Sequence, residues 1–325
     1  GLSYCRQLIS PPLMREAVGS AVVWMFVSFG CLSPHIVTDF RLPRLFTALL
    51  VGGGLGVCGL ITQTLFENPL ADPSLFGIHA GAAVGAAIGP LLWSLIVAMG
   101  QTRFPPFVGQ WFNVFTALCG ALGVLAVIVL LARSACRGTS LLVAGVMVSF
   151  LLSSVLALIA YYSTADGLRS FQLWTMGDFS MVGRARLPLF ALALGLPLGY
   201  CLRRHAVLDA WLLGEDYAVT LGVSPRKSRS RLLFAVGWIS ACTTAFCGPI
   251  AFIGLAAPHL ARLLCGTSLH RYLLPTTLGV GAVLTLSCQL LCSLPFTGGN
   301  LPLNAVTPLI GAPIVLWLLT RQSTP

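Results

Sequence analysis

Long apolar runs, separated by short polar segments, make up most of the chain. The pattern predicts membrane helices at about residues 45–65, 75–98, 111–132, 141–162, 187–202, 232–252, 254–267, 273–294 and 303–320. A helix needs about 20 apolar residues to cross the hydrocarbon core of a bilayer. Several of these runs are shorter or contain Gly and Pro, which is typical of broken helices in a tight bundle. We therefore expect an all-α polytopic membrane protein with about nine or ten transmembrane helices.

Composition supports this fold class. Of the 325 residues, 57% are hydrophobic and only 9% are charged, whereas soluble domains carry about 25% charged residues. The net charge of +10 comes from 19 basic and 9 acidic residues. A basic chain can bind nucleic acid or anionic substrates. Here the charges cluster between apolar runs, which favours loop arginines that orient the helices in the bilayer. We expect contact with membrane lipid and no nucleic-acid partner.

The distribution of basic residues predicts which loops face the cytoplasm. Basic residues gather in four segments that fall on one side of the membrane when the helices are counted from the C-terminus. They are Arg133 and Arg137, the segment from Arg203 to Arg231, Arg271, and Arg321. By the positive-inside rule that side is cytoplasmic. The same count places Arg41 and Arg44 outside.

The sequence offers little that could carry catalysis. Its eleven cysteines are scattered through apolar runs, without a CxxC pair or zinc-ligand spacing. No GxSxG, HExxH or Walker motif occurs. Charged residues inside the predicted helices are rare, and His259 and Arg262 share one short helix. An ion-coupled carrier would keep such residues at mid-membrane. We expect no metal site, no catalytic residue and an energy source outside this chain.

Two polar segments stand out. "FENPLADPSLFG" (66–77) interrupts two apolar runs, and the sidedness places it at their cytoplasmic ends. Its prolines indicate a helix stop and restart, and Asn68 and Asp72 are suited to capping exposed backbone groups. We interpret Asn68, Pro69, Asp72 and Pro73 as a structural corner. The second segment, 208–231, predicts a short amphipathic helix followed by a basic tail. It could lie on the membrane surface alone or dock on a soluble motor subunit.

Several blocks together resemble one family. They are "RLPRLFTALLVGGGLGVCGLITQTLFENPLADPSLFGIHAGAAVG" (41–85), "LLVAGVMVSFLLSSVLALI", "LWTMGDFS", "LLGEDYAVTLGVSP", "GPIAFIGLAAPHLARLLCG" and "LPLNAVTPLIGAPIVLWLL". In order and spacing they are similar to the permeases of iron–siderophore, haem and cobalamin ABC importers, the FecCD/BtuC type. The resemblance covers about residues 41–320.

The resemblance implies a type II ABC importer transmembrane domain in the bacterial inner membrane. Two copies form a central pathway as a homodimer, two cytoplasmic ATPase subunits bind ATP and Mg, and a periplasmic binding protein delivers the substrate. This chain would then hold no cofactor and would not be an enzyme. The ATPase coupling helix of the family matches Leu213, Gly214, Glu215, Ala218, Leu221 and Gly222.

Further site residues follow from the same resemblance. Arg41 and Arg44 correspond to arginines that pair with the binding protein, with anchoring at lipid headgroups as the alternative. Thr139 and Ser140 correspond to the cytoplasmic gate, and they are also suited to capping a helix. Where the family usually carries Asp and Arg near the end of its ninth helix, this chain has Gln289 and Ser293.

The N-terminal region departs from the family pattern. Residues 1–12 resemble the stretch that normally follows the first helix, and the apolar segment 17–31 is only about 15 residues long, which is marginal for a span. We therefore divide the chain into an N-terminal segment, 1–40, with an atypical or missing first helix, and a transmembrane permease domain, 41–325.

The function expected from the sequence is import of an iron complex, either a ferric siderophore or haem. Cobalamin is the alternative cargo, because "FENPLADP" is very close to that branch's version of the motif. A channel or carrier outside the ABC class, and a membrane scaffold, are the remaining alternatives. A channel or carrier would have charged mid-membrane residues and no docking helix, and a scaffold would need neither a gate nor broken helices.

Overall fold

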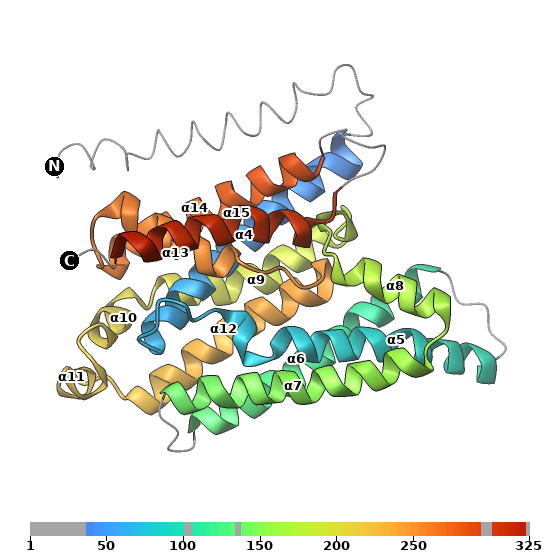
Figure 1. The fold of residues 1–325 in the computed structure, drawn as a ribbon, viewed down its shortest axis with the longest axis horizontal. Coiled ribbons are helices and arrows are strands. Elements are labelled where there is room, and N and C mark those ends of the chain that lie inside the picture. Colours follow the sequence, from blue (N-terminus) through green and yellow to red (C-terminus); the bar gives the residue numbers. More distant parts are fainter. Residues whose placement is uncertain (1–36, 101–105, 134–137, 294–300, 323–325) are drawn as a thin grey trace.

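The computed structural model describes residues 37–100, 106–133, 138–293 and 301–322 (Figure 1). The predicted N-terminal segment 1–40, including the apolar stretch 17–31, lies outside these residues except for positions 37–40. The described residues are mostly helical and contain no strand.

Twelve α-helices and three short turns make up the described chain. The helices are α4 (Leu42–Leu65), α5 (Ile78–Gly100), α6 (Pro106–Arg133), α7 (Gly138–Tyr162), α8 (Ala165–Thr175), α9 (Leu187–Leu202), α10 (His205–Trp211), α11 (Glu215–Thr220), α12 (Pro225–Cys247), α13 (Ile253–Cys265), α14 (His270–Cys292) and α15 (Leu303–Gln322). The turns are η1 (Val37–Arg41), η2 (Pro73–Phe76) and η3 (Phe179–Met181).

Each of the nine predicted membrane helices has a counterpart in the structure. Within the described residues, five helices are long and apolar enough to cross a membrane: α4, α6, α7, α12 and α14. The least accurate prediction was 232–252, because α12 begins at Pro225 and ends at Cys247. The basic tail predicted before that helix is its first two turns, which begin at a proline in the first helical position.

The central helix of the bundle is α4. It packs against α9, α12, α13 and α14, and its residues from Val51 to Phe66 are all buried. Glycines permit this close approach, as in many membrane helix pairs. A Cβ on Gly59 would collide with the carbonyl oxygen of Gly254 at the start of α13, and one on Gly52 would collide with that of Gly281 in α14. Small residues therefore fix the spacing of the core.

Two helices begin inside the bundle instead of at its surface. Before α5, Gly77 adopts φ +75° beside Gly145 and Ser149 of α7, which lie about 10 to 16 Å along that helix from its first residue. Before α13, Phe252 adopts φ +70°, a left-handed conformation that is rare outside glycine. The sequence predicts broken helices in general, from short apolar runs that contain Gly and Pro, but it did not locate these internal starts.

The unwound segment before α13 obtains its hydrogen bonds from Asn304. The Asn304 Nδ2 atom donates to the carbonyl oxygens of Thr175 and Pro249, both at 2.8 Å, and its Oδ1 accepts from the Ala251 amide at 3.4 Å. Backbone groups at membrane depth must be satisfied within the protein. One amide side chain on α15 does this for a segment about fifty residues away in the sequence.

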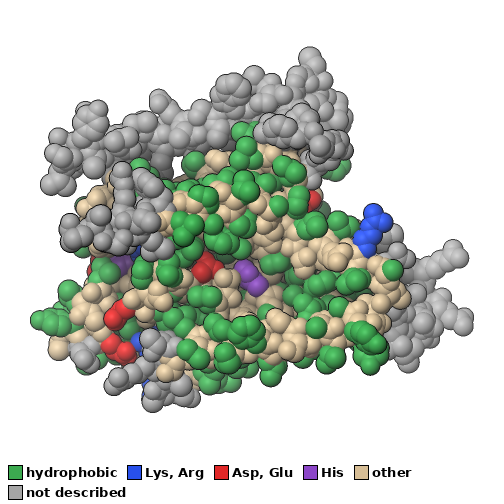
Figure 2. Space-filling view, in the orientation of Figure 1, with side chains coloured by type: hydrophobic (Ala, Val, Ile, Leu, Met, Phe, Trp, Pro, Cys, Tyr) green, Lys and Arg blue, Asp and Glu red, His purple; other side chains and the backbone are tan. Residues whose placement is uncertain are grey.

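Helix α7 lies along one edge of the bundle, and only 6% of the residues in its most apolar stretch are buried. Exposed side chains along it include Val143, Phe150, Leu151 and Leu158. Figure 2 shows that the face of the molecule carrying α7 is covered mostly by hydrophobic side chains, with acidic and histidine side chains near its centre. Such a surface is suited to lipid or to another membrane protein.

Candidate functional site

At one end of the bundle, on the left in Figure 1, α10 lies beside the ends of the membrane helices and α11 projects beyond them. Gly214 precedes α11 with φ +96° and ψ 162°, and Gly222 follows it with φ +79°. Both values favour glycine. The turn closes on Ala218, which is buried and whose carbonyl accepts a hydrogen bond from the Val223 amide at 3.0 Å. The two glycines and Ala218 therefore define the shape of this segment.

An ion pair fastens α11 to the first turns of α12. Glu215 Oε2 lies 2.9 Å from Nη2 of Arg229, whose side chain is almost completely buried. The same guanidinium stacks over the Trp211 ring, 4.9 Å from its centroid, and the Trp211 indole donates to Ser228 Oγ at 3.2 Å. These contacts tie α11 and the end of α10 to the first turns of α12.

The outer surface of α11 is apolar. Leu213, Tyr217, Val219 and Leu221 are all more than half exposed, at 59%, 63%, 55% and 59%. Exposed apolar side chains gathered on a projecting segment mark an interaction surface. Of the residues predicted to form the coupling helix, Leu213 and Leu221 face outward, Ala218 faces inward, and Glu215 anchors the segment.

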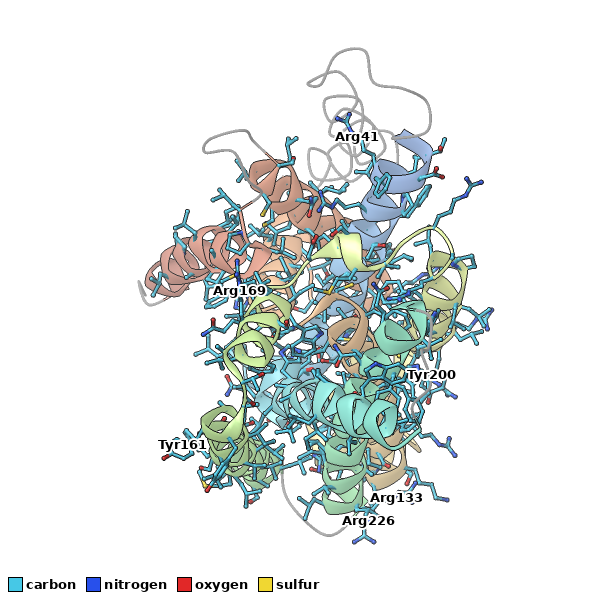
Figure 3. All side chains as sticks on the ribbon, turned by 90° about the vertical axis from the view of Figure 1, so that its right-hand side faces the viewer. Arg41, Arg133, Tyr161, Arg169, Tyr200 and Arg226 are labelled. Carbon is cyan, nitrogen blue, oxygen red and sulfur yellow. The ribbon has the colours of Figure 1, made fainter. Side chains whose placement is uncertain are left out.

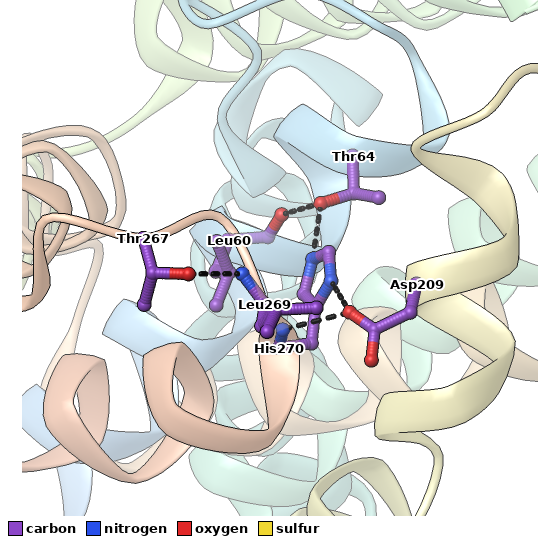
Figure 4. Close-up of polar contacts among 6 residues, drawn as sticks. All are labelled: Leu60, Thr64, Asp209, Thr267, Leu269 and His270. Carbon is purple, nitrogen blue, oxygen red and sulfur yellow. Dashed lines mark hydrogen bonds and ion pairs between the residues drawn. The ribbon is translucent and has the colours of Figure 1, made fainter.

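Figure 4 shows a buried polar link behind this segment that was not predicted from the sequence. His270, the first residue of α14, places Nδ1 2.9 Å from Asp209 Oδ1 on α10 and Nε2 2.9 Å from Thr64 Oγ1 near the end of α4. The His270 amide also donates to Asp209 Oδ1 at 2.7 Å. The three side chains join α10, α14 and α4. The available signal was Asp209, one of three acidic residues in the segment 208–231.

The predicted structural corner follows directly after α4. Glu67, at φ +49°, occupies the left-handed position after the helix, and the Asn68 amide returns to the Gln63 carbonyl at 3.2 Å. These are the features of a Schellman helix end. Asn68 Oδ1 then accepts from the Leu70 amide at 2.9 Å, and Asp72 Oδ2 accepts from the Ser74 amide at 3.0 Å.

The two prolines of the corner occupy different environments. Pro69 is exposed, whereas Pro73 is buried as the first residue of η2. Because η2 packs against α7, the segment 66–77 turns back into the bundle and does not remain at the cytoplasmic surface. The sequence placed this segment at the cytoplasmic ends of both adjoining helices. Helix α5 instead begins inside the bundle, and the cytoplasmic position of the end of α4 stays a prediction.

The opposite end of the bundle carries the predicted binding-protein contacts. Arg44 Nη2 lies 3.1 Å from Asp178 Oδ1, so this arginine already has an acidic partner within the chain. Arg41 is half-buried at the end of η1 and is labelled at the top of Figure 3. A second ion pair joins Arg184 Nη1 to Asp39 Oδ1 at 3.0 Å.

A fourth arginine at this end, Arg186, contacts an aromatic ring. Arg186 donates to Gln110 Oε1 at 2.8 Å and lies 4.8 Å from the Trp111 ring centroid. Partial burial lowers the pKa of the Arg186 guanidinium, which remains charged at neutral pH.

The remaining predicted residues are less informative. The Thr139 side chain lies outside the described residues, and Ser140 is exposed in the first turn of α7. Gln289 is buried, and the Ser293 hydroxyl donates to the Leu290 carbonyl at 2.8 Å, which closes the end of α14. Among the described residues, no group of three or more His, Cys, Asp or Glu side chains is arranged to hold a metal ion.

Comparison with known proteins defines the class. Vitamin B12 import system permease proteins BtuC are 34% identical in Citrobacter koseri and 35% in Klebsiella pneumoniae, over 323 residues. Each alignment covers 99% of this chain, and 90% and 89% of the respective relative.

Among solved structures, a metal-chelate type ABC transporter in an inward-facing conformation matches with a TM-score of 0.82 and 29% identity, covering 96% of this chain and 100% of that one. PsaBC from Streptococcus pneumoniae shares the fold, with a TM-score of 0.55 at 13% identity over 93% of this chain and 95% of that one.

The helical bundle, its broken helices and these similarities define a multi-pass inner-membrane permease of an ABC importer. Residues 9–321 match the FecCD transport family as a whole. The chain belongs to the FecCD transport family, as the resemblance in its sequence indicated.

Proposed function

We propose that this chain is the permease subunit through which an ABC importer moves a bulky metal chelate into the cytoplasm, with cobalamin as the first candidate cargo. The identity of 34–35% to vitamin B12 import permeases over 99% of the chain carries this proposal. An iron complex, the cargo first expected from the sequence, is the second candidate. It is supported by the metal-chelate type transporter at 29% identity.

The chain would work within a larger assembly. A second copy would complete the pathway, two ATPase subunits would bind ATP and Mg, and a binding protein would deliver the cargo at the end carrying Arg41 and Arg44. The nearly unburied apolar surface of α7 supports a second membrane-embedded partner, because a single chain leaves it uncovered. Thr139 and Ser140, in the first turn of α7, would lie at the cytoplasmic gate.

The contacts of α11 suggest how ATP-driven closure of the ATPases would be coupled to the membrane helices. The exposed apolar side chains around it would dock on the ATPase, and closure of the ATPases on ATP would displace the segment. Two buried connections would transmit that displacement: Glu215–Arg229 to α12, and Asp209–His270–Thr64 to α14 and α4. Since no bond is made or broken in this chain, catalysis would rest with the ATPase partners.

Transport in proteoliposomes tests the cargo. The chain, its ATPase and its binding protein are reconstituted together, and uptake of labelled cobalamin, a ferric siderophore and haem is measured with and without ATP. We expect ATP-dependent accumulation of cobalamin above the other two. Preference for an iron complex would reverse the order of the candidates, and uptake that persists without ATP would contradict an ABC importer.

The role of α11 is tested separately with Gly214→Ala. A side chain at φ +96° strains the backbone by about 1–2 kcal/mol and displaces the start of α11. We expect ATP hydrolysis to continue while uptake per ATP falls, with binding-protein docking unchanged. Gly183→Ala is the matched control, because a Cβ there meets nothing within 4 Å. Uptake per ATP equal to the wild-type value in Gly214→Ala would remove the coupling assignment.

A further inference from the structure

A groove that plays no part in the proposed mechanism opens between α6, α9 and α12. Its volume is about 480 Å³, and Val129, Arg133, Pro197, Tyr200, Arg231 and Phe234 contribute to its lining. A second hollow along α9 shares Tyr200 and is bordered by Gly195, Gly199, Arg203 and Arg204. Figure 3 shows Arg133 and Tyr200 on the same side of the bundle.

The walls of both hollows are apolar and face outward. Leu130, Leu196 and Phe234 are exposed on the three helices that form them. A Cβ added at Gly195 or Gly199 would meet no atom within 4 Å, so the surface of α9 is open along two turns. In a bilayer, a smooth apolar surface of this kind lies against acyl chains.

Arginines border the hollows at the end predicted to be cytoplasmic. Arg133 is the last residue of α6, Arg203 and Arg204 follow α9 directly, and Arg231 lies in the second turn of α12. In the part of the chain that the structure describes, the four ion pairs involve other residues, and neither hollow is lined by an acidic side chain. Positive charge therefore remains uncompensated beside an apolar surface.

Two of these arginines are held in place by neighbours. Arg133 Nε donates to Ser230 Oγ at 3.4 Å, and the Arg204 guanidinium lies over the Tyr200 ring, 4.8 Å from its centroid. Guanidinium groups bind phosphate through paired N–H donors, and a stacked guanidinium keeps its edge free for this purpose.

We propose that the two hollows together bind an anionic phospholipid of the cytoplasmic leaflet. Its phosphates would lie among Arg133, Arg203, Arg204 and Arg231, and its acyl chains would follow α9 and Phe234. Basic pockets between membrane helices on the cytoplasmic side are suited to such headgroups. Cardiolipin, which has two phosphates and four acyl chains, suits two adjoining hollows. Free phosphate would use only the arginines and leave the apolar walls uncovered.

Native mass spectrometry of the purified full-length permease, titrated with cardiolipin or phosphatidylethanolamine, tests this site. We expect one cardiolipin per chain to bind more tightly than phosphatidylethanolamine. Because a basic residue near the membrane surface contributes about 1 kcal/mol toward anionic lipid, the double variant R133Q/R231Q should bind cardiolipin about tenfold or more weakly. Arg271→Gln removes the same charge on α14, away from the groove, and should change the affinity less than about twofold.

A second variant separates the apolar contact from the charge. Gly199→Leu fills the open surface of α9, where an added Cβ meets no atom within 4 Å, and it leaves all four arginines in place. It should weaken cardiolipin binding while the variant unfolds at the wild-type temperature. Equal binding by R133Q/R231Q and the wild type, an equal loss in Arg271→Gln, or displacement of cardiolipin by inorganic phosphate would each overturn the proposal.

Discussion

His270 shows how much one buried side chain contributes at the cytoplasmic end. It is 1% exposed and hydrogen-bonds two side chains that lie far apart in the sequence. Removing one partner of a buried hydrogen bond lowers the free energy of unfolding by more than the bond itself contributes, because the group left behind stays desolvated without a partner. The consequences of a substitution here are therefore specific to the atoms removed.

His270→Ala leaves the Asp209 carboxylate and the Thr64 hydroxyl without this partner. We expect a loss of about 2 kcal/mol in unfolding free energy and a lower ratio of uptake to ATP hydrolysis. His270→Asn should recover part of both, because an asparagine amide reaches the position of Nδ1 and donates to Asp209. Unfolding in detergent and coupled transport assays measure the two effects.

His205→Ala provides the control for that experiment, since His205 is half-buried on the same helix as Asp209. It should change stability by less than about 0.5 kcal/mol. If His270→Ala lowered stability but left the uptake-to-hydrolysis ratio intact, the link would be structural and would not transmit movement.

Glu67 adopts a left-handed backbone conformation in the corner after α4. A non-glycine residue in the left-handed region costs about 1–2 kcal/mol, so Glu67→Gly should be more stable than Glu67→Ala by about 1 kcal/mol. Both variants remove the carboxylate and only one removes the strain. Thermal unfolding of the pair checks the difference, and equal stabilities would mean that the backbone does not hold φ +49° in the native protein.

At the scale of elements, glycine positions decide how the helices pack. A Cβ on Gly59 would collide with the backbone of Gly254, whereas one on Gly123 in α6 meets nothing within 4 Å. Gly59→Ala should therefore destabilise the protein by about 3 kcal/mol. Gly123→Ala should be neutral or stabilising by up to about 1 kcal/mol. A comparison of unfolding temperatures tests both, and similar values would show that α4 and α13 are not in this close contact.

The membrane helices themselves were predictable, because an apolar run of sufficient length is a local signal. The start of α12 was not, since Arg226, Lys227 and Arg229 looked like a loop although they follow a proline suited to a first helical turn. The internal start of α5 was also missed, because only packing of η2 against α7 places it.

The site residues also fall into those that a local sequence signal predicts and those that only the folded structure reveals. Gly214 and Gly222 could be predicted to form turns, because glycine adopts positive φ values without the steric cost of a side chain. Asn304 and His270 could not, because their partners lie 53 and 206 residues away. Arg44 was expected to contact a separate protein, and only the structure shows that Asp178 of the same chain already pairs with it.

At the scale of the whole molecule, sidedness unites these observations. The segment around α11 and the arginines beside the two hollows on α9 lie at the end that the charge distribution predicts to be cytoplasmic. The Arg44–Asp178 and Arg184–Asp39 ion pairs lie at the opposite end. The first end would then face the ATPase subunits, and the second would face the periplasmic binding protein.

Labelling of introduced cysteines tests this orientation. With a membrane-impermeant maleimide, Arg184→Cys should react in cells whose outer membrane has been made permeable, because Arg184 is exposed. Tyr217→Cys, also exposed, should react only after the inner membrane is opened. The unaltered chain gives the background from native cysteines. Reaction of Tyr217→Cys from outside would invert the topology and with it the proposed roles of both ends.

The short helix α13 has a consequence for how the protein is made. Its 13 residues extend about 20 Å, less than the roughly 30 Å of hydrocarbon that a free-standing helix must cross. Its preceding backbone is satisfied by Asn304 on α15, which is synthesised later. The ribosome therefore delivers α13 before the side chain that completes its surroundings exists. The hydrogen bonds of the segment before α13 can therefore form only after α15 has emerged from the ribosome.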